Sequence, residues 1–270
     1  MAFRLIFLLL PILVLTSAGL PEKGPLPEKK PVETEATPSP PKVDNADKNP
    51  AKDAKPRPAP LDQKPDRKPE AKAQTEPKLI IEPENNKEHA ACLAALKAIG
   101  ASFREEKRID DGKGCGIDRP LSLQSVLPGI ALKPEGKMRC ETALELARWT
   151  KEAVLPAAKA ALESEGPLTS VNQASSYVCR LRNNATSGKI SEHARGNAVD
   201  VASFTFNSGK SIEIQPRDED STLAGAFQRA VTATGCLYFA TVLDPGSDEA
   251  HENHLHFDVI ERKGGYRYCR

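Results

Sequence analysis

Three of the five histidines in the 270-residue chain lie in the short stretch HENHLH, from His251 to His256. A fourth, His193, stands seven residues before Asp200 in the stretch SEHARGNAVDV. Imidazole and carboxylate groups are typical zinc ligands, and catalytic zinc sites use three of them and leave one position for water. His193, Asp200 and one of the two histidines of HLH, His254 or His256, would supply such a set. The sequence therefore predicts a zinc site, at which zinc would activate water and polarise a carbonyl group.

The elements around these residues must bring them together. Gly196 predicts a turn after His193, and the alternating run NAVDVASFTF predicts a strand that carries Asp200. The run LHFDV predicts a second strand, on which His254 and His256 face the same side because side chains alternate. One of these histidines can then bind the metal while the other stands beside the water and moves a proton.

The remaining pattern predicts helices before most of the strands. Helices are expected over 87–100 with Gly100 as C-cap, over 140–164 with a kink near Pro156, and over 220–235 with Asp220 or Ser221 as N-cap. His89, in the first of these, is expected to be a surface or boundary residue. Strands are expected mostly after Thr169, over 170–180, 197–206, 210–215, 237–243 and 254–260. This order predicts an α+β fold with a largely antiparallel sheet and helices on one side.

The cysteines point to an oxidising compartment. None of the six forms the close pair that structural zinc sites use. Residues 1–18 have the basic residue, apolar run and small residues of a cleaved secretory signal, with an uncleaved tether as the alternative. An even cysteine count behind such a signal predicts disulfides in a secreted or periplasmic protein without a stable membrane anchor. The connectivity stays open, and short spacing favours Cys92 with Cys115. The six are Cys92, Cys115, Cys140, Cys179, Cys236 and Cys269.

A change in composition predicts the domain organisation. Residues 21–83 hold 15 of the 23 prolines and no aromatic residue, so residues 19–83 are expected to form a disordered spacer or a ligand for a partner. Residues 84–270 are long enough to form one domain with a core. The net charge of +1 gives no reason to expect nucleic acid as a partner.

These stretches carry a family resemblance. SEHARGNAVDV followed by HLHFDV resembles the zinc D-Ala-D-Ala carboxypeptidase, lysostaphin and hedgehog superfamily, whose pattern is His, six residues, Asp, and a late His-x-His or Glu-x-x-His. The chain is more similar still to the bacterial extensin-like C-terminal domain family, through SYVCR, SEHARGNAVDV, TVLDPGSDEAHENHLHFDV and YRYCR. The resemblance covers about 91–270 and implies a hedgehog or D-Ala-D-Ala-peptidase-like fold.

The resemblance also implies roles for single residues. The metal ligands would be His193, Asp200 and His256, and His254 would be the catalytic residue beside the scissile carbonyl. Where related proteins have a glutamate as general base, this chain has an asparagine, so His254 or another nearby group must act as base. The substrate-binding residues would be Arg180, for which Arg182 could substitute, and Ser191. The other groups near enough to act as base are His251, Glu252 and Asp248.

The function implied is that of a zinc metallopeptidase acting on peptidoglycan or its peptides. The first alternative is a non-catalytic wall-binding module that keeps the metal site. The second is a metal-free, disulfide-rich interaction domain. The oligomeric state and the bond that is cleaved stay open.

Overall fold

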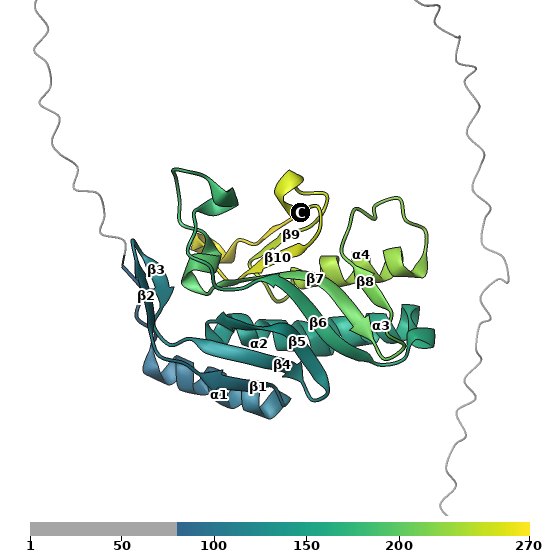
Figure 1. The fold of residues 1–270 in the computed structure, drawn as a ribbon, viewed down its shortest axis with the longest axis horizontal. Coiled ribbons are helices and arrows are strands. Elements are labelled where there is room, and N and C mark those ends of the chain that lie inside the picture. The colour runs from purple at the N-terminus through teal and green to yellow at the C-terminus, as the bar shows by residue number, and fades with distance from the viewer. Residues whose placement is uncertain (1–79) are drawn as a thin grey trace, which may run out of the picture. The chain divides into compact units, whose positions relative to one another are not determined.

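The computed structural model describes residues 80–270, and the predictions for the secretory signal and for the spacer up to residue 79 lie outside that range. The described residues form an α+β fold with a nine-stranded sheet, a separate two-stranded sheet and a small number of helices (Figure 1). The fold class therefore agrees with the sequence-based prediction. Between residues 80 and 270 there is no helix with the length and apolar character needed to cross a membrane.

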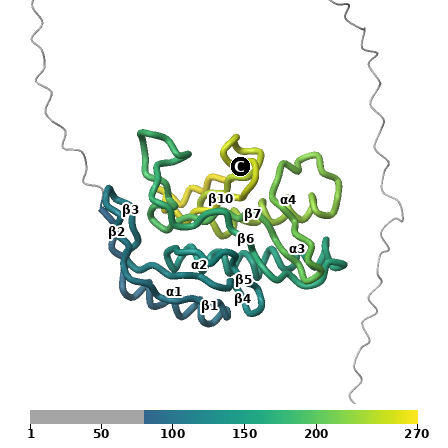
Figure 2. Tube along the Cα trace, in the orientation of Figure 1, coloured from purple at the N-terminus to yellow at the C-terminus, as the bar shows by residue number. Residues whose placement is uncertain are grey.

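The large sheet has the strand order β1-β4-β5-β6-β7-β10-β9-β11, and β8 pairs with β7. Only β5 with β6 and β9 with β11 are parallel neighbours, so the sheet is mostly antiparallel. Its strands are β1 (Ser102–Glu105), β4 (Leu121–Leu127), β5 (Ile130–Met138), β6 (Leu168–Ser175), β7 (Ala198–Phe206), β8 (Ser211–Glu213), β9 (Thr241–Leu243), β10 (Leu255–Asp258) and β11 (Tyr268–Cys269). The small sheet is the hairpin of β2 (Ile109–Gly112) and β3 (Cys115–Ile117), which Figure 2 shows within the blue N-terminal part of the domain.

The helices follow their sequence signals closely, with one correction. They are α1 (Asn86–Ile99), α2 (Cys140–Trp149), α3 (Leu155–Ala161) and α4 (Leu223–Gly235). Gly100 ends α1 in the left-handed conformation, as predicted. A π-helical turn joins α2 to α3 just before Pro156, where the kink was expected. The predicted N-cap of α4 is wrong: Thr222 is the cap, because its hydroxyl accepts a hydrogen bond from the amide of Gly225.

The helices α2 and α4 pack on the same face of the sheet. Trp149 of α2 contacts Phe257 of β10 and Phe204 of β7, with ring centroids 4.8 and 5.9 Å apart. Phe227 of α4 contacts the same Phe204 at 5.2 Å. Since one side chain touches both helices, this face of β7 and β10 forms the centre of the hydrophobic core.

A bulge in β7 keeps its apolar residues on this face. The pairing with β6 passes from Ser203 to Val201 and skips Ala202. A skipped residue reverses the alternation of side chains, so Val201 and Phe204 both face the core although three positions separate them. Asp200, next to Val201, therefore faces away from the helices.

The predicted order of elements is wrong for the first half of the domain. Five strands, β1 to β5, precede α2, whereas the sequence pattern placed most strands after Thr169. The segments of β1 and β2 are short and mostly polar, β3 has only three residues, and β5 contains Pro134 and Gly136, which weaken a strand pattern. Alternation therefore did not reveal these four strands, whereas β4 begins with the alternating run LSLQ and was missed although its pattern is visible.

All six cysteines form disulfides, as predicted, but the favoured pairing is wrong. Cys92 bonds to Cys140, not to Cys115, because α1 packs along α2 and brings these two residues to a Cα–Cα distance of 6.1 Å. Cys115 bonds to Cys179, and Cys236 bonds to Cys269.

Candidate metal centre

His193 lies in a short turn that its own sequence defines. The hydroxyl of Ser191 accepts a hydrogen bond from the amide of His193 and caps the 3₁₀ turn Glu192–Arg195. Gly196 ends the turn with φ of 70°. A Cβ atom there would lie 2.4 Å from Ile117, so only glycine fits both the conformation and the space.

The N-terminus of α2 fixes the same turn from the other side. The carbonyl of Gly196 accepts hydrogen bonds from the amide of Arg139 and the hydroxyl of Thr142, both at 2.9 Å. The turn that carries His193 is thus attached to a helix of the core.

Asp200 and His256 meet because β7 and β10 are paired. In the antiparallel register Asp200 stands directly opposite His256, and Val199 stands opposite Phe257. Since Phe257 faces the helices, Asp200 and His256 face the other side, where the turn of His193 lies.

The three side chains form a compact set of ligand atoms. Nε2 of His193 lies 3.1 Å from Nδ1 of His256 and 3.1 Å from Oδ1 of Asp200. Nδ1 of His256 lies 2.9 Å from Oδ1 of Asp200. In a tetrahedral zinc site with bonds of about 2.1 Å, neighbouring ligand atoms stand about 3.4 Å apart. The three residues, all buried, therefore fit a zinc ion with little adjustment.

Other groups of the chain hold the two imidazole rings in this orientation. Nδ1 of His193 donates to the carbonyl of Ser176 at 2.7 Å. Nε2 of His256 lies 3.4 Å from Oδ2 of Asp258, whose other oxygen accepts from the hydroxyl of Thr241 at 2.7 Å. A second hydrogen bond of this kind is what metal-binding histidines usually make, since it fixes the ring and leaves the other nitrogen for the metal.

The protonation of this cluster reflects competing effects. Burial raises the pKa of Asp200, but hydrogen bonds from His193 and His256 outweigh burial and hold the pKa well below its ordinary range. Burial lowers the pKa of His256, while hydrogen bonds to Asp200 and Asp258 raise it to about 9. The cluster therefore combines an ionised carboxylate with an imidazole that favours a positive charge, and a divalent cation can take the place of the proton.

His254 lies beside the three residues and not among them. It precedes β10, which begins at Leu255, so the expectation that it lies on the strand is wrong by one residue. Its Nε2 is 3.7 Å from Oδ1 of Asp200, and its Nδ1 is 2.9 Å from the side-chain oxygen of Asn253. Burial lowers the pKa of His254, against the opposing charge of Asp200, which favours the neutral ring at pH 7.

A cavity of about 300 Å³ opens over the cluster, within the range of small-molecule sites. Arg180 and Ser191, the predicted substrate-binding residues, both line it. Arg182 lines it too but forms an ion pair with Glu192 at 3.0 Å. The hydroxyl of Ser191 already caps the turn of His193. Other lining residues are Asn183, Asn184, His193, Thr241, Leu243, Ala250, His251, His254, His256, Asp258, Arg262 and Tyr268.

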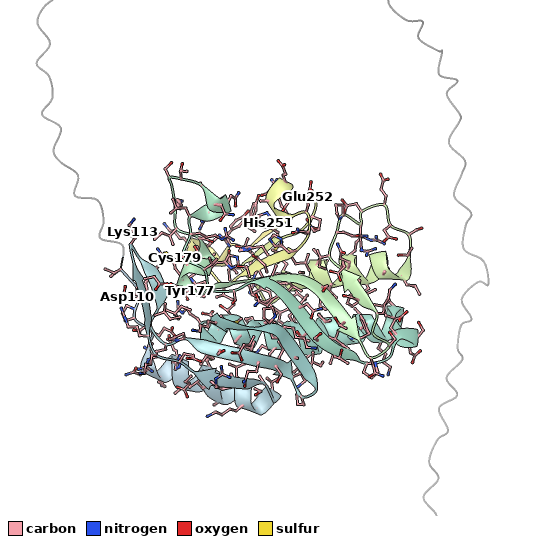
Figure 3. All side chains as sticks on the ribbon, in the orientation of Figure 1. Asp110, Lys113, Tyr177, Cys179, His251 and Glu252 are labelled. Atoms are coloured by element: carbon pink, nitrogen blue, oxygen red, sulfur yellow. A yellow bond between two sulfur atoms is a disulfide. The ribbon has the colours of Figure 1, made fainter. Side chains whose placement is uncertain are left out.

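His251, one of the groups considered as base, is buried and lines the cavity. Its Nδ1 lies 2.6 Å from Oδ1 of Asp248, and its ring centroid lies 5.7 Å from that of His256. Figure 3 shows His251 on the loop that faces the segment of Tyr177 and Cys179. Of the other groups considered as base, Asp248 is hydrogen-bonded to His251, and Glu252 is exposed to solvent.

The first described residues brace the turn of His193 from outside the cavity. Glu82 pairs with Arg195 of the turn at 3.0 Å. The carboxylate of Glu84 pairs with Arg139 at 3.4 Å and with His89 at 3.0 Å. The expectation of a surface or boundary position for His89 is therefore wrong, because the ring is buried by this contact.

The fold and the site define a disulfide-linked α+β domain with a buried His/Asp/His cluster under an arginine-lined cavity. Residues 90–270 match the family described as extensin-like protein C-terminus, and the chain belongs to this family. A search of curated proteins and a search of solved structures each found no match.

Proposed function

We propose that this protein is a secreted or periplasmic zinc peptidase that hydrolyses peptide bonds in peptidoglycan. We further propose that its domain has the fold of the zinc D-Ala-D-Ala carboxypeptidase, lysostaphin and hedgehog superfamily. The observation that carries the proposal is the triangle of ligand atoms from His193, Asp200 and His256, with sides near 3 Å, under a cavity of substrate size.

The residues of the cavity would have different roles in the reaction. His193, Asp200 and His256 would hold the metal, and zinc in such a site supplies a Lewis acid that polarises a carbonyl group and activates water. His254, beside the cluster and neutral at pH 7, is placed to take up a proton and to return it to the leaving amine. Arg180 has no ion pair among the described residues and is placed to bind a carboxylate or carbonyl oxygen of the substrate.

One observation favours a second candidate, a wall-binding module without turnover. The two carboxylates that line the cavity, Glu192 and Asp258, are already paired with Arg182 and with Thr241. Asn253 stands where a catalytic glutamate would be expected from the resemblance. Turnover therefore depends on a histidine as base.

The decisive experiment is incubation of the zinc-loaded protein with purified muropeptides, with mass spectrometry of the products. Peptidase activity predicts products that differ from substrate by one hydrolysed bond, and the His256→Ala variant should give none. Zinc binding with retention of intact muropeptides would support the wall-binding module instead. A wild-type chain that binds no zinc would refute both candidates.

A further inference from the structure

A second cavity, of about 540 Å³, lies between α2 and the segment that follows β10. Leu237 and Tyr266 line it with 71% and 61% of their surface exposed, which places them among the most exposed large apolar side chains of the described residues. Tyr238 lies beside them. We name this surface the tyrosine groove. Its remaining lining residues are Glu141, Glu145, Arg148, Ala240, Val259, Ile260, Glu261, Arg262, Gly265 and Arg267.

The tyrosine groove is built on a fixed framework. Arg262 donates to the carbonyl of Ala240 at 2.7 Å, and Arg267 donates to the carbonyl of Phe239 at 2.8 Å. The disulfide Cys236–Cys269 joins the same two segments. Since the backbone around Tyr266 and Leu237 is held before any ligand arrives, binding would cost little ordering of the protein.

The charges of the groove balance. Three carboxylates and three guanidinium groups line it, so it offers no net field to a strongly charged ligand. The guanidinium groups are largely used within the protein, since Arg148 pairs with Glu145 at 2.7 Å and the other two donate to backbone carbonyls. The carboxylates of Glu141 and Glu261 make no hydrogen bond among the described residues and can accept from hydroxyl or amide groups of a ligand. Next to them, the faces of tyrosine rings offer apolar contact with a polar edge. This combination matches a ligand that is uncharged, rich in hydroxyl and amide groups, and apolar on its ring faces. The charged residues are Glu141, Glu145, Glu261, Arg148, Arg262 and Arg267.

The tyrosine groove adjoins the cavity of the candidate metal centre through one shared residue, Arg262. The guanidinium of Arg262 also donates to the hydroxyl of Thr241, the partner of Asp258. On its other side the groove shares Glu141 and Arg148 with a further cavity of about 520 Å³ along α1. A row of adjoining cavities of this kind suits a polymer more than a small molecule.

We propose that the tyrosine groove binds a neutral oligosaccharide, with Tyr266 as the stacking platform and Arg262 at the boundary to the metal centre. This inference rests on the proposed function, because it takes the oligosaccharide to be the glycan part of the same wall polymer. The glycan would then lie in the groove while its attached peptide enters the cavity of His256.

The test is calorimetric titration of the full-length protein with an N-acetylglucosamine hexamer. Tyr266→Ala is expected to weaken binding by about tenfold, because the ring contact is lost. Tyr266→Phe should retain the affinity, since it keeps the ring. The matched control is Leu223→Ala, which removes a side chain 63% exposed on α4 outside the groove and should change nothing. Melting temperatures show whether each variant is folded.

Two results would overturn the proposal: no binding of the hexamer by the wild-type protein, or unchanged binding by folded Tyr266→Ala. If Tyr266→Ala instead loses affinity for sugar-free wall peptides, the groove is a peptide subsite and the oligosaccharide is the wrong ligand. His256→Ala separates this inference from the proposed function, because it should lose zinc and any hydrolysis while the affinity for the hexamer stays the same.

Discussion

At the scale of single residues, the candidate centre assigns different tasks to two histidines only two positions apart. Nδ1 of His256 points at His193 and Asp200, whereas Nε2 of His254 reaches only to within 3.7 Å of the carboxylate. Removal of a metal ligand should release the metal, whereas removal of a proton carrier should leave the metal bound. The two substitutions should perturb the fold to a similar degree, so a difference between them reports on chemistry.

We therefore expect His254→Ala to keep zinc near one ion per chain and to lower any hydrolysis by about 10²- to 10³-fold. His256→Ala is expected to lose the zinc itself, because only two ligands remain. Metal analysis of the dialysed variants, followed by the muropeptide assay, checks both. Equal loss of zinc in the two variants would show that His254 is a ligand.

The types and spacing of the residues could predict His193 and Asp200 as candidate ligands, but the choice of His256 over His254 came from the family resemblance. Asp258 was missed although it lies two positions after His256 in the same alternating run and so faces the same side. The carbonyl of Ser176 could not have been found, because a backbone group leaves no trace in the residue type. The burial of His89 depends on Glu84 and on the packing of α1, which spacing does not reveal.

At the scale of elements, the turn that presents His193 depends on Gly196. We expect Gly196→Ala to lower the free energy of unfolding by about 2–4 kcal/mol, from the left-handed conformation and from overpacking against Ile117. Zinc affinity should fall with it, since the turn must shift. Denaturant unfolding and zinc competition titration measure the two effects.

Gly129→Ala is the control for this prediction. Gly129 has a similar φ of 77°, but nothing lies within 4 Å of an added Cβ atom. The Gly129→Ala variant should therefore lose only about 1–2 kcal/mol of its free energy of unfolding and keep its zinc affinity. Equal effects on zinc affinity at the two positions would show that the contact of Gly196 does not position the site.

The disulfide Cys115–Cys179 ties the segment after β6 to the hairpin β2–β3. That segment contains Ser176, whose carbonyl orients His193. Replacing both cysteines by alanine is expected to cost about 2–4 kcal/mol of stability and to weaken zinc binding. The same replacement of Cys236 and Cys269 should cost a similar amount of stability but leave zinc affinity unchanged, as competition titration of both variants would show.

The elements themselves were only partly predictable. The alternation in 197–206 predicted β7, but it could not show that Ala202 would be bulged, because the bulge arises from pairing with β6. That bulge decides which side of the sheet Asp200 faces. Similarly, Cys92 and Cys140 meet through the packing of α1 on α2, which local spacing cannot express.

At the scale of the whole molecule, residues 80–84 belong to the support of the site. A chain that begins at residue 80 is expected to fold and to bind zinc like the full-length chain. A chain that begins at residue 85 keeps Asn85, the N-cap of α1, but lacks Glu82 and Glu84, so Arg195 loses its ion pair and His89 loses its buried partner. We expect the free energy of unfolding of the shorter chain to be lower by about 3 kcal/mol, as measured by denaturant unfolding. Failure of the longer one to fold would place part of 1–79 in the core.

The disulfides also decide what a single cut by a protease would do. Cys92–Cys140 and Cys115–Cys179 interleave along the chain, so a cut anywhere between residues 92 and 179 leaves both pieces covalently joined. No disulfide spans residues 180–235, and the exposed loop 182–189 lies in that interval, where proteases cut readily. A nick in this loop would leave no covalent link between the two pieces, and the C-terminal piece, still paired through β7 and β6 in the folded protein, carries all three candidate ligands and Tyr266. Electrophoresis without reductant would show two bands after that nick and one band after a nick in the hairpin β2–β3.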